Sequence, residues 1–151
     1  MKNPVLFCYD GSDGSRRALA AAAEWIAPGD AVALTVWAPA SVLLSRAGSF
    51  IVAIPNEGEV DDQEAASAAR IAKEGADLAR KRGYNVEARV AETRESVAKT
   101  IEKVADDVGA GLIVCGQRGR GAITSVLLGS VSHALAEHTK RPVLIAPERA
   151  S

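Results

Sequence analysis

A glycine-rich segment from Gly116 to Ser132 carries the residues best suited to chemistry. Glycines let backbone N–H groups approach an anion without a Cβ atom in the way, and they permit the positive φ values that aim successive amides at one point. We expect Gly116 and Gly119 to form such a nest. Gly129 and Ser130 stand where the main part of the last helix is predicted to start, so that free amides and the helix dipole favour an anion there. These features predict a phosphate site.

Side chains within this segment have more than one interpretation. Ser130 and Ser132 offer hydroxyl donors, whereas the guanidinium groups of Arg118 and Arg120 are expected to be solvated. The alternative for the whole segment is a surface loop before an ordinary serine-capped helix. Two common phosphate motifs do not fit. No Gly-Lys-Ser/Thr follows the first glycine at the Walker A distance, and Thr124 fills the third glycine position of G-x-G-x-x-G.

The elements that must position this segment follow from the hydrophobic pattern. Five short runs rich in Val, Leu and Ile are continuous rather than alternating, which is typical of strands buried on both faces. These runs are Val5 to Tyr9, Ala31 to Trp37, Asn85 to Ala91, Leu112 to Cys115 and Pro142 to Ala146. Helical patterns lie between them. The alternating order predicts an α/β fold, a single doubly wound, Rossmann-like five-stranded parallel sheet with helices on both faces.

Helix limits are predicted by capping residues and breakers. Ser12 is the expected N-cap of the first helix, which Pro28-Gly29-Asp30 ends. A helix with apolar residues at Val97, Ile101, Val104 and Val108 is expected to begin at Thr93 or Arg94 and to end at Gly109. An alanine stripe predicts close helix-to-sheet packing: Ala65, Ala68, Ala69, Ala72, Ala76 and Ala79.

Two further segments have predicted structures. The last helix is expected to cover roughly Ser125 to Thr139. Pro39 to Asp61 is a long connection with apolar residues of its own, and such connections are often lids or binding loops. We favour a short extra helix or a flap over the core, and the alternative is a partner-binding or gating element.

Length and composition predict one soluble domain, residues 1–151. Apolar residues make up 48% of the chain and charged residues 25%, as in globular proteins. With 18 Lys and Arg against 19 Asp and Glu, no overall positive field favours nucleic acid. The first apolar run is too short for a signal peptide or a membrane span, so we expect a cytoplasmic protein. Cys8 and Cys115 are interpreted as reduced core thiols rather than a redox pair.

Gly116, Gly119, Gly129 and Ser130 occupy the four positions of a G-x2-G-x9-G-S/T motif, and through it the sequence resembles the universal stress protein family. Val5 to Ser12 resembles that family's opening strand with its Asp-Gly-Ser turn, and Arg141 to Ile145 resembles its closing strand. The resemblance covers nearly the whole chain. It implies the strand order 3-2-1-4-5, in which the first and fourth strands are neighbours and their carboxyl ends flank one crevice.

The resemblance also implies an ATP site. The residues carried over are Asp10 and Val36 around the adenosine and Gly116, Gly119, Gly129, Ser130 and Val131 around the phosphates, to which Ser132 adds a hydroxyl. Asp10 could accept bonds from a ribose hydroxyl, hold Mg²⁺ through water, or only cap the turn into the first helix. Thr35 stands where many relatives have His, which leaves the details of the adenine pocket open.

Three functions are compatible with these residues. We favour a binding module in which ATP occupancy changes a surface read by regulatory protein partners. The second is a slow ATP hydrolase or self-phosphorylating enzyme with Ser130 or Ser132 as acceptor, for which His133 is a weak candidate base and His138 none. The third is a scaffold without nucleotide. The resemblance further implies a homodimer that pairs through the last strand.

Overall fold

The computed structural model describes residues 3–47, 56–118 and 128–148 of the chain. Gly119 and Arg120 of the glycine-rich segment lie outside the described residues, as does part of the long connection, residues 48–55. The described helices and strands are β1 Val5–Cys8, α1 Asp13–Trp25, β2 Asp30–Trp37, α2 Ala40–Ala47, α3 Glu57–Arg80, β3 Asn85–Glu92, α4 Val97–Val108, β4 Leu112–Gly116, α5 Ser130–His138 and β5 Val143–Ala146.

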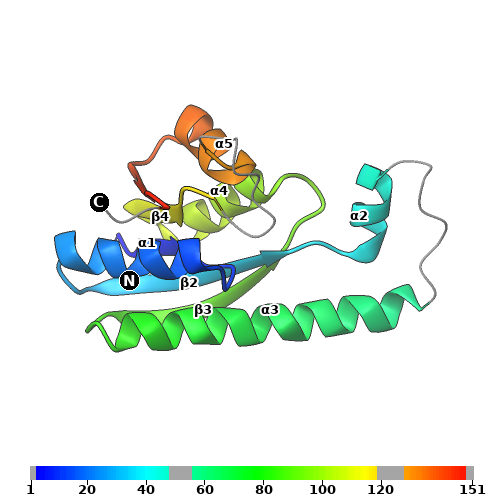
Figure 1. The fold of residues 1–151 in the computed structure, drawn as a ribbon, viewed down its shortest axis with the longest axis horizontal. Helices are drawn as coiled ribbons and strands as arrows, with labels where there is room; N and C mark the ends of the chain where they lie inside the picture. The colour runs from blue at the N-terminus through cyan, green and yellow to red at the C-terminus, as the bar shows by residue number, and fades with distance from the viewer. Residues whose placement is uncertain (1–2, 48–55, 119–127, 149–151) are drawn as a thin grey trace.

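The strands form one parallel sheet in the order β3-β2-β1-β4-β5, which confirms the predicted topology. Successive side chains of β1 enter two separate cores. Phe7 and the following Tyr9 pack with α1 and α3, whereas Leu6 and Cys8 pack with α4 and α5. Figure 1 shows α3 along one side of the sheet and α4 and α5 on the other. The prediction of helices on both faces is therefore confirmed.

Burial on both faces holds only for the central strands. β1, β2 and β4 are largely buried, but the edge strand β3 exposes Glu87 and Ala88, and β5 leaves Val143, Leu144 and Ile145 half-buried. The prediction of full burial was wrong for these two strands. An edge strand has a neighbour on one side only, so a polar side chain there stays hydrated at no cost.

Capping residues set the helix starts. Ser12 caps α1 as predicted, because its Oγ accepts the backbone N–H of Ser15 at 3.2 Å. The predicted start of α4 was wrong: Ser96 is its N-cap and accepts from Lys99 N at 3.2 Å. Thr93 cannot begin that helix, since its N–H extends the sheet by donating to Trp37 O at 2.8 Å. Gly109, with a φ of 65°, ends α4 as predicted.

The last helix begins later than predicted in the part of the chain that the structure describes. α5 begins at Ser130, because Gly129 is its N-cap with extended backbone and Leu128 lies outside the helix. The remaining residues of the predicted start, 125–127, lie outside the described part of the chain.

Small residues let α3 lie close to the sheet, as the alanine stripe predicted. Ala68, Ala72, Ala76 and Ala79 are buried, although Ala69 is exposed. Gly75 makes the closest approach of this helix: a Cβ atom there would lie 2.7 Å from Cγ of Tyr9.

The preferred interpretation of the long connection is confirmed by α2, a short extra helix. The backbone N–H of Ala40 at its start donates to Oδ1 of Asp61 in α3 at 2.8 Å. Figure 1 shows α2 at one end of the molecule, following the carboxyl end of β2. The long connection therefore places a helix at the end of the sheet where ligand crevices open in such folds.

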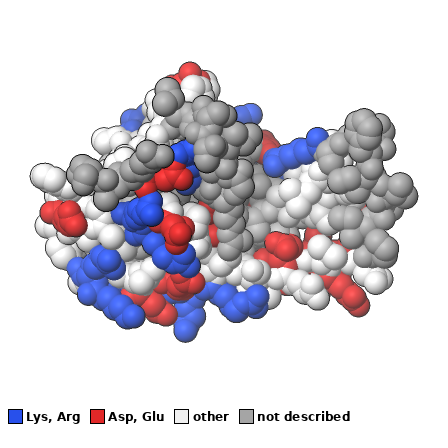
Figure 2. Space-filling view, viewed as in Figure 1, with Lys and Arg blue, Asp and Glu red and all other residues white. Residues whose placement is uncertain are grey.

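Charged side chains of both signs are interspersed on the face shown in Figure 2. Arg16 pairs with Glu74 at 2.8 Å, and Arg80 pairs with Asp77 at 2.8 Å. Exposed pairs of this kind contribute little stability. Within the described ranges, no helix is both long enough and apolar enough to cross a membrane.

Candidate functional site

One cavity of about 870 Å³ opens at the carboxyl ends of β1, β2 and β4. The chain leaves β1 and β4 there toward opposite faces of the sheet, which is where doubly wound sheets bind ligands. The predicted site residues that line this cavity are Asp10, Val36, Gly116, Gly129, Ser130, Val131 and Ser132. The remaining one, Gly119, lies outside the described residues. Folding thus brings seven separately predicted positions to one place.

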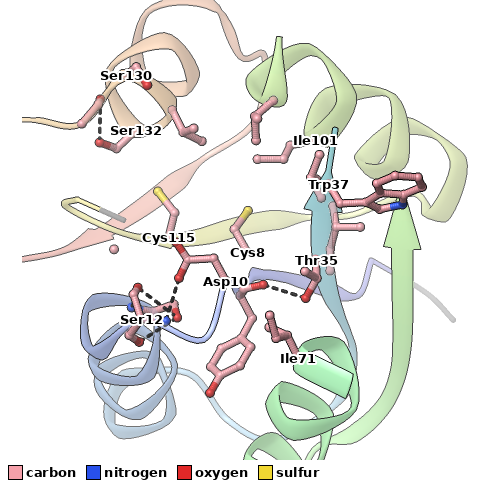
Figure 3. Close-up of a pocket in the computed structure, with 18 of the residues that line it drawn as sticks. Cys8, Asp10, Ser12, Thr35, Trp37, Ile71, Ile101, Cys115, Ser130 and Ser132 are labelled. Atoms are coloured by element: carbon pink, nitrogen blue, oxygen red, sulfur yellow. Dashed lines mark hydrogen bonds between the residues drawn. The ribbon is translucent and has the colours of Figure 1, made fainter. Parts of the chain in front are cut away.

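One end of the cavity is apolar. Val36 of β2 lines it together with Leu43 of α2, Ile71 of α3, and Val97 and Ile101 of α4. Figure 3 shows Ile71 and Ile101 bordering the cavity from two different helices. An apolar wall of this kind suits a flat ring such as a nucleobase. The sequence did not predict Leu43, Ile71 and Val97 as site residues. An apolar side chain in a helical pattern is normally interpreted as part of the hydrophobic core.

The other end of the cavity contains the start of α5. The first backbone N–H that bonds inside this helix is that of His133, which donates to Gly129 O at 2.9 Å. The amides of Ser130, Val131 and Ser132 precede it and have no carbonyl partner within the helix. Gly129 caps the helix without a side-chain bond. Among the residues that the structure describes, these three amides have no hydrogen-bond acceptor, and they lie at the positive end of the helix dipole, which favours an anion.

The glycines of the motif pack against backbone. A Cβ atom on Gly116 would lie 2.9 Å from the carbonyl carbon and oxygen of Gly14, and one on Gly129 would lie 3.4 Å from Gln117 O. Neither Gly116 nor Gly129 has a positive φ. Gly116 thus lacks the positive φ that a nest was expected to use, and Gly119, the other residue of the predicted nest, lies outside the described residues. Gly116 is required because the end of β4 passes directly against the first turn of α1.

The Ser132 hydroxyl is used inside the protein. This side chain is buried, and its Oγ donates to Gln117 O at 2.8 Å, an oxygen that also accepts the Gly129 N–H at 2.8 Å. The bonds join the two ends of the glycine-rich segment. Ser130, in contrast, is exposed at the first position of α5. The hydroxyl of Ser132, which was expected to be a donor to the ligand, is thus bonded within the protein.

Asp10 and Thr35 both organise the turn after β1. Oδ1 of Asp10 accepts the Ser12 N–H at 2.9 Å, which is the capping role weighed from the sequence. Thr35 is buried, and its hydroxyl donates to Tyr9 O at 2.7 Å (Figure 3). Both residues also line the cavity. No cluster of three or more His, Cys, Asp or Glu side chains suited to a metal occurs in the described ranges.

The prediction that Arg118 is solvated was wrong. Only 13% of its side chain is exposed, it lines the cavity, and its guanidinium pairs with the carboxylate of Glu148. His133 also lines the cavity, but its imidazole is exposed and lies 3.2 Å from Glu137. Of the two basic side chains that line the cavity within the described ranges, Arg118 is thus the more buried.

Two reduced thiols lie side by side beneath the cavity. Phe7 pairs with Val114 in the sheet, so Cys8 and Cys115 follow on neighbouring strands, and Figure 3 shows their sulfur atoms on the same side. Burial raises the pKa of Cys115 to about 11. Burial also raises the pKa of Cys8, and the nearby Cys115, Asp10 and Glu102 add to that shift. Both thiols are neutral near pH 7.

This burial predicts a pH dependence of stability. An unfolded thiol ionises near pH 8.5, whereas folded Cys115 resists ionisation until about pH 11. The folded state therefore has its full advantage below about pH 8.5 and loses about 3 kcal/mol of stability as the pH rises toward 11, at about 1.4 kcal/mol for each pH unit. Urea unfolding of the wild type and of Cys115→Ala measures this effect. The difference between their free energies of unfolding is expected to narrow as the pH rises from about 8.5 to about 11. A constant difference would contradict it.

The described fold and cavity define a class of α/β protein with a ligand crevice at the switch point of a parallel sheet. The universal stress protein family matches residues 1–147 of the chain. A relative, the universal stress protein YxiE of Bacillus subtilis strain 168, is 30% identical over 149 residues, which covers 96% of this chain and 99% of the relative. The chain belongs to the universal stress protein family.

Solved structures of similar proteins share this fold. The universal stress protein UspA from Lactobacillus plantarum superposes with a TM-score of 0.73 at 20% identity, covering 97% of this chain and 99% of that one. A universal stress protein in complex with cAMP gives a TM-score of 0.60 at 27% identity, covering 95% of each chain. Similar proteins from Archaeoglobus fulgidus and Arabidopsis thaliana were solved with dAMP and AMP. Several structural neighbours of this chain therefore hold adenine nucleotides.

Proposed function

We propose that the chain binds ATP in the cavity and acts as a nucleotide-dependent regulatory module. The observation that carries this proposal is the pairing, within one cavity, of an apolar wall with the free amides at the start of α5. An adenine nucleotide has the matching chemistry, an apolar ring at one end and an anion at the other. Relatives solved with cAMP, dAMP and AMP support the same ligand class.

The lining residues then have distinct roles. Val36 and Ile71 pack against the adenine, and Asp10 receives a ribose hydroxyl or holds a water of Mg²⁺. The phosphates lie at the first turn of α5, where they accept from the amides of Ser130, Val131 and Ser132. Gly116 and Gly129 let backbone segments pack closely at that end. The Ser132 hydroxyl holds the helix start in place by its bond to Gln117.

A binding role fits the described groups better than catalysis. Besides apolar side chains, the cavity is lined by polar groups that are already bonded within the protein, such as Asp10, Thr35 and Ser132. The imidazole among its described lining residues, His133, is exposed and pairs with Glu137 on the surface of α5. Occupancy would instead act through the shape of the surface around α2 and α5, which regulatory partners would read.

The proposal covers a single domain, residues 1–151, that works in the cytoplasm as a homodimer. β5 lies at an edge of the sheet with Val143, Leu144 and Ile145 half-buried. An edge with apolar side chains supports pairing with a second copy across that strand.

Titration calorimetry with ATP, AMP and adenosine, with Mg²⁺ and with EDTA, tests the central claim. We expect ATP to bind, adenosine to bind more weakly because it lacks phosphates, and nucleotide recovered after an hour to be intact ATP. Recovery of ADP would move the protein into the hydrolase class. A folded wild type that binds neither ATP nor adenosine would eliminate the nucleotide function and favour the scaffold.

A further inference from the structure

Arg118 is held in place from both sides of the cavity floor. Its carbonyl oxygen would lie 2.6 Å from a Cβ atom on Gly14, and its Cα would lie 3.4 Å from one on Gly129. The backbone of Arg118 therefore passes between the first turns of α1 and α5. Its side chain is largely buried and lines the cavity together with Gly129 and Ser130. The stem of this side chain, with its Cγ atom 3.8 Å from a Cβ atom on Gly129, is thus fixed beside the helix start that would receive the phosphates.

The carboxylate of Glu148 is brought to this guanidinium by the segment that follows β5. The backbone N–H of Glu148 donates to Oε1 of Gln117 at 2.9 Å, and its carbonyl oxygen accepts from the guanidinium of Arg17. The carboxylate itself pairs with Arg118. Two of the three contacts thus use backbone atoms, so the segment stays anchored when the carboxylate moves. With 40% of its side chain exposed, Glu148 can turn toward solvent at little cost.

We propose that Glu148 is an internal competitor of the ligand's phosphates for Arg118, an inference that rests on the proposed nucleotide site. A guanidinium prefers the anion with more charge and more acceptor oxygens. A triphosphate exceeds a single carboxylate in both respects, whereas adenosine offers neither. Binding of a polyphosphate transfers Arg118 from Glu148 to the ligand and releases the carboxylate to the surface beside β5. The contact therefore makes affinity depend on the number of phosphates.

Two matched variants test this competition. Glu148→Gln removes the charge but keeps the backbone contacts of residue 148, and Glu137→Gln removes the same charge from an exposed position of α5 that pairs with His133. Calorimetry with ATP, tripolyphosphate and adenosine is expected to show about five- to tenfold tighter binding of both polyphosphates to Glu148→Gln. Adenosine binding should stay within about twofold, and Glu137→Gln should change each affinity less than about twofold.

A double-variant cycle identifies Arg118 as the shared partner. In an Arg118→Gln background, the gain from Glu148→Gln is expected to disappear. Where Arg118→Gln does not fold, judged by circular dichroism, the comparison of Glu148→Gln with Glu137→Gln still decides the matter. Equal or weaker polyphosphate binding by Glu148→Gln would overturn the inference.

The same experiment separates the two proposals. If tripolyphosphate shows the Glu148 dependence while adenosine does not bind and ATP binds no more tightly than tripolyphosphate, the nucleotide function fails and the competition stands. If adenosine and ATP bind but Glu148→Gln changes nothing, the nucleotide function stands and the competition fails. Absence of binding by every ligand to the folded wild type and to Glu148→Gln would overturn both.

Discussion

Ser130→Glu is expected to weaken ATP binding by at least about 100-fold while the protein stays folded. Ser130 is exposed at the first position of α5, where a carboxylate interacts favourably with the helix dipole. The thermal midpoint should therefore stay level or rise. The same carboxylate lies where the proposed phosphates accept from the helix amides, so it competes for those amides and repels the ligand. Affinity and stability are thus expected to change in opposite directions.

Calorimetry with ATP and adenosine measures this effect, and circular dichroism melting checks the fold. Ser130→Gln is the matched control, since it adds nearly the same volume without the charge and should retain most ATP affinity. Adenosine binding should change little in both variants. If Ser130→Glu bound ATP as the wild type does, the phosphates would not lie at this helix. Substitution of Gly116 would be a poorer test, because its Cβ atom would collide with the backbone of Gly14.

Gly75→Ala is expected to lower the free energy of unfolding by about 2 kcal/mol or more. The new Cβ atom would lie 2.7 Å from Cγ and 2.8 Å from Cδ1 of Tyr9, and the ring cannot retreat because it is itself buried. The Tyr9 hydroxyl is also bonded to Glu74. α3 would have to move off the sheet, which opens one wall of the cavity. Ordinary helix propensity would instead favour alanine at this position.

Gly58→Ala in the same helix is the matched control. A Cβ atom there meets nothing within 4 Å, so the substitution is expected to be neutral or to stabilise by up to about 1 kcal/mol. Urea unfolding of both variants measures the contrast. Equal effects of the two substitutions would show that α3 does not approach Tyr9 as closely as the structure has it. A loss of stability in Gly75→Ala alone would confirm that packing decides whether a glycine-to-alanine substitution in this helix stabilises or destabilises the protein.

Local patterns were enough to predict much of this fold. The cap at Ser12 depends on a side chain and an amide three residues apart, and the end of α4 depends on the left-handed backbone of Gly109. The order of strands and helices follows from hydrophobic periodicity over short windows. The strand order came from the resemblance to a family, and the structure confirms it. The start of α4 was mispredicted because Thr93 belongs to a contact with Trp37, far away in the sequence.

Local sequence patterns and distant contacts also contribute differently to the candidate site. Its glycines and serines could be located from their spacing, because the motif lies within one short stretch of chain. Contacts between distant segments decided what each residue does there: Gly116 passes Gly14, the Ser132 hydroxyl bonds to Gln117, and Arg118 pairs with Glu148. The apolar wall likewise joins residues of β2, α2, α3 and α4. Such contacts are absent from sequence periodicity, since they form only when packed helices and strands bring remote residues within a few ångströms.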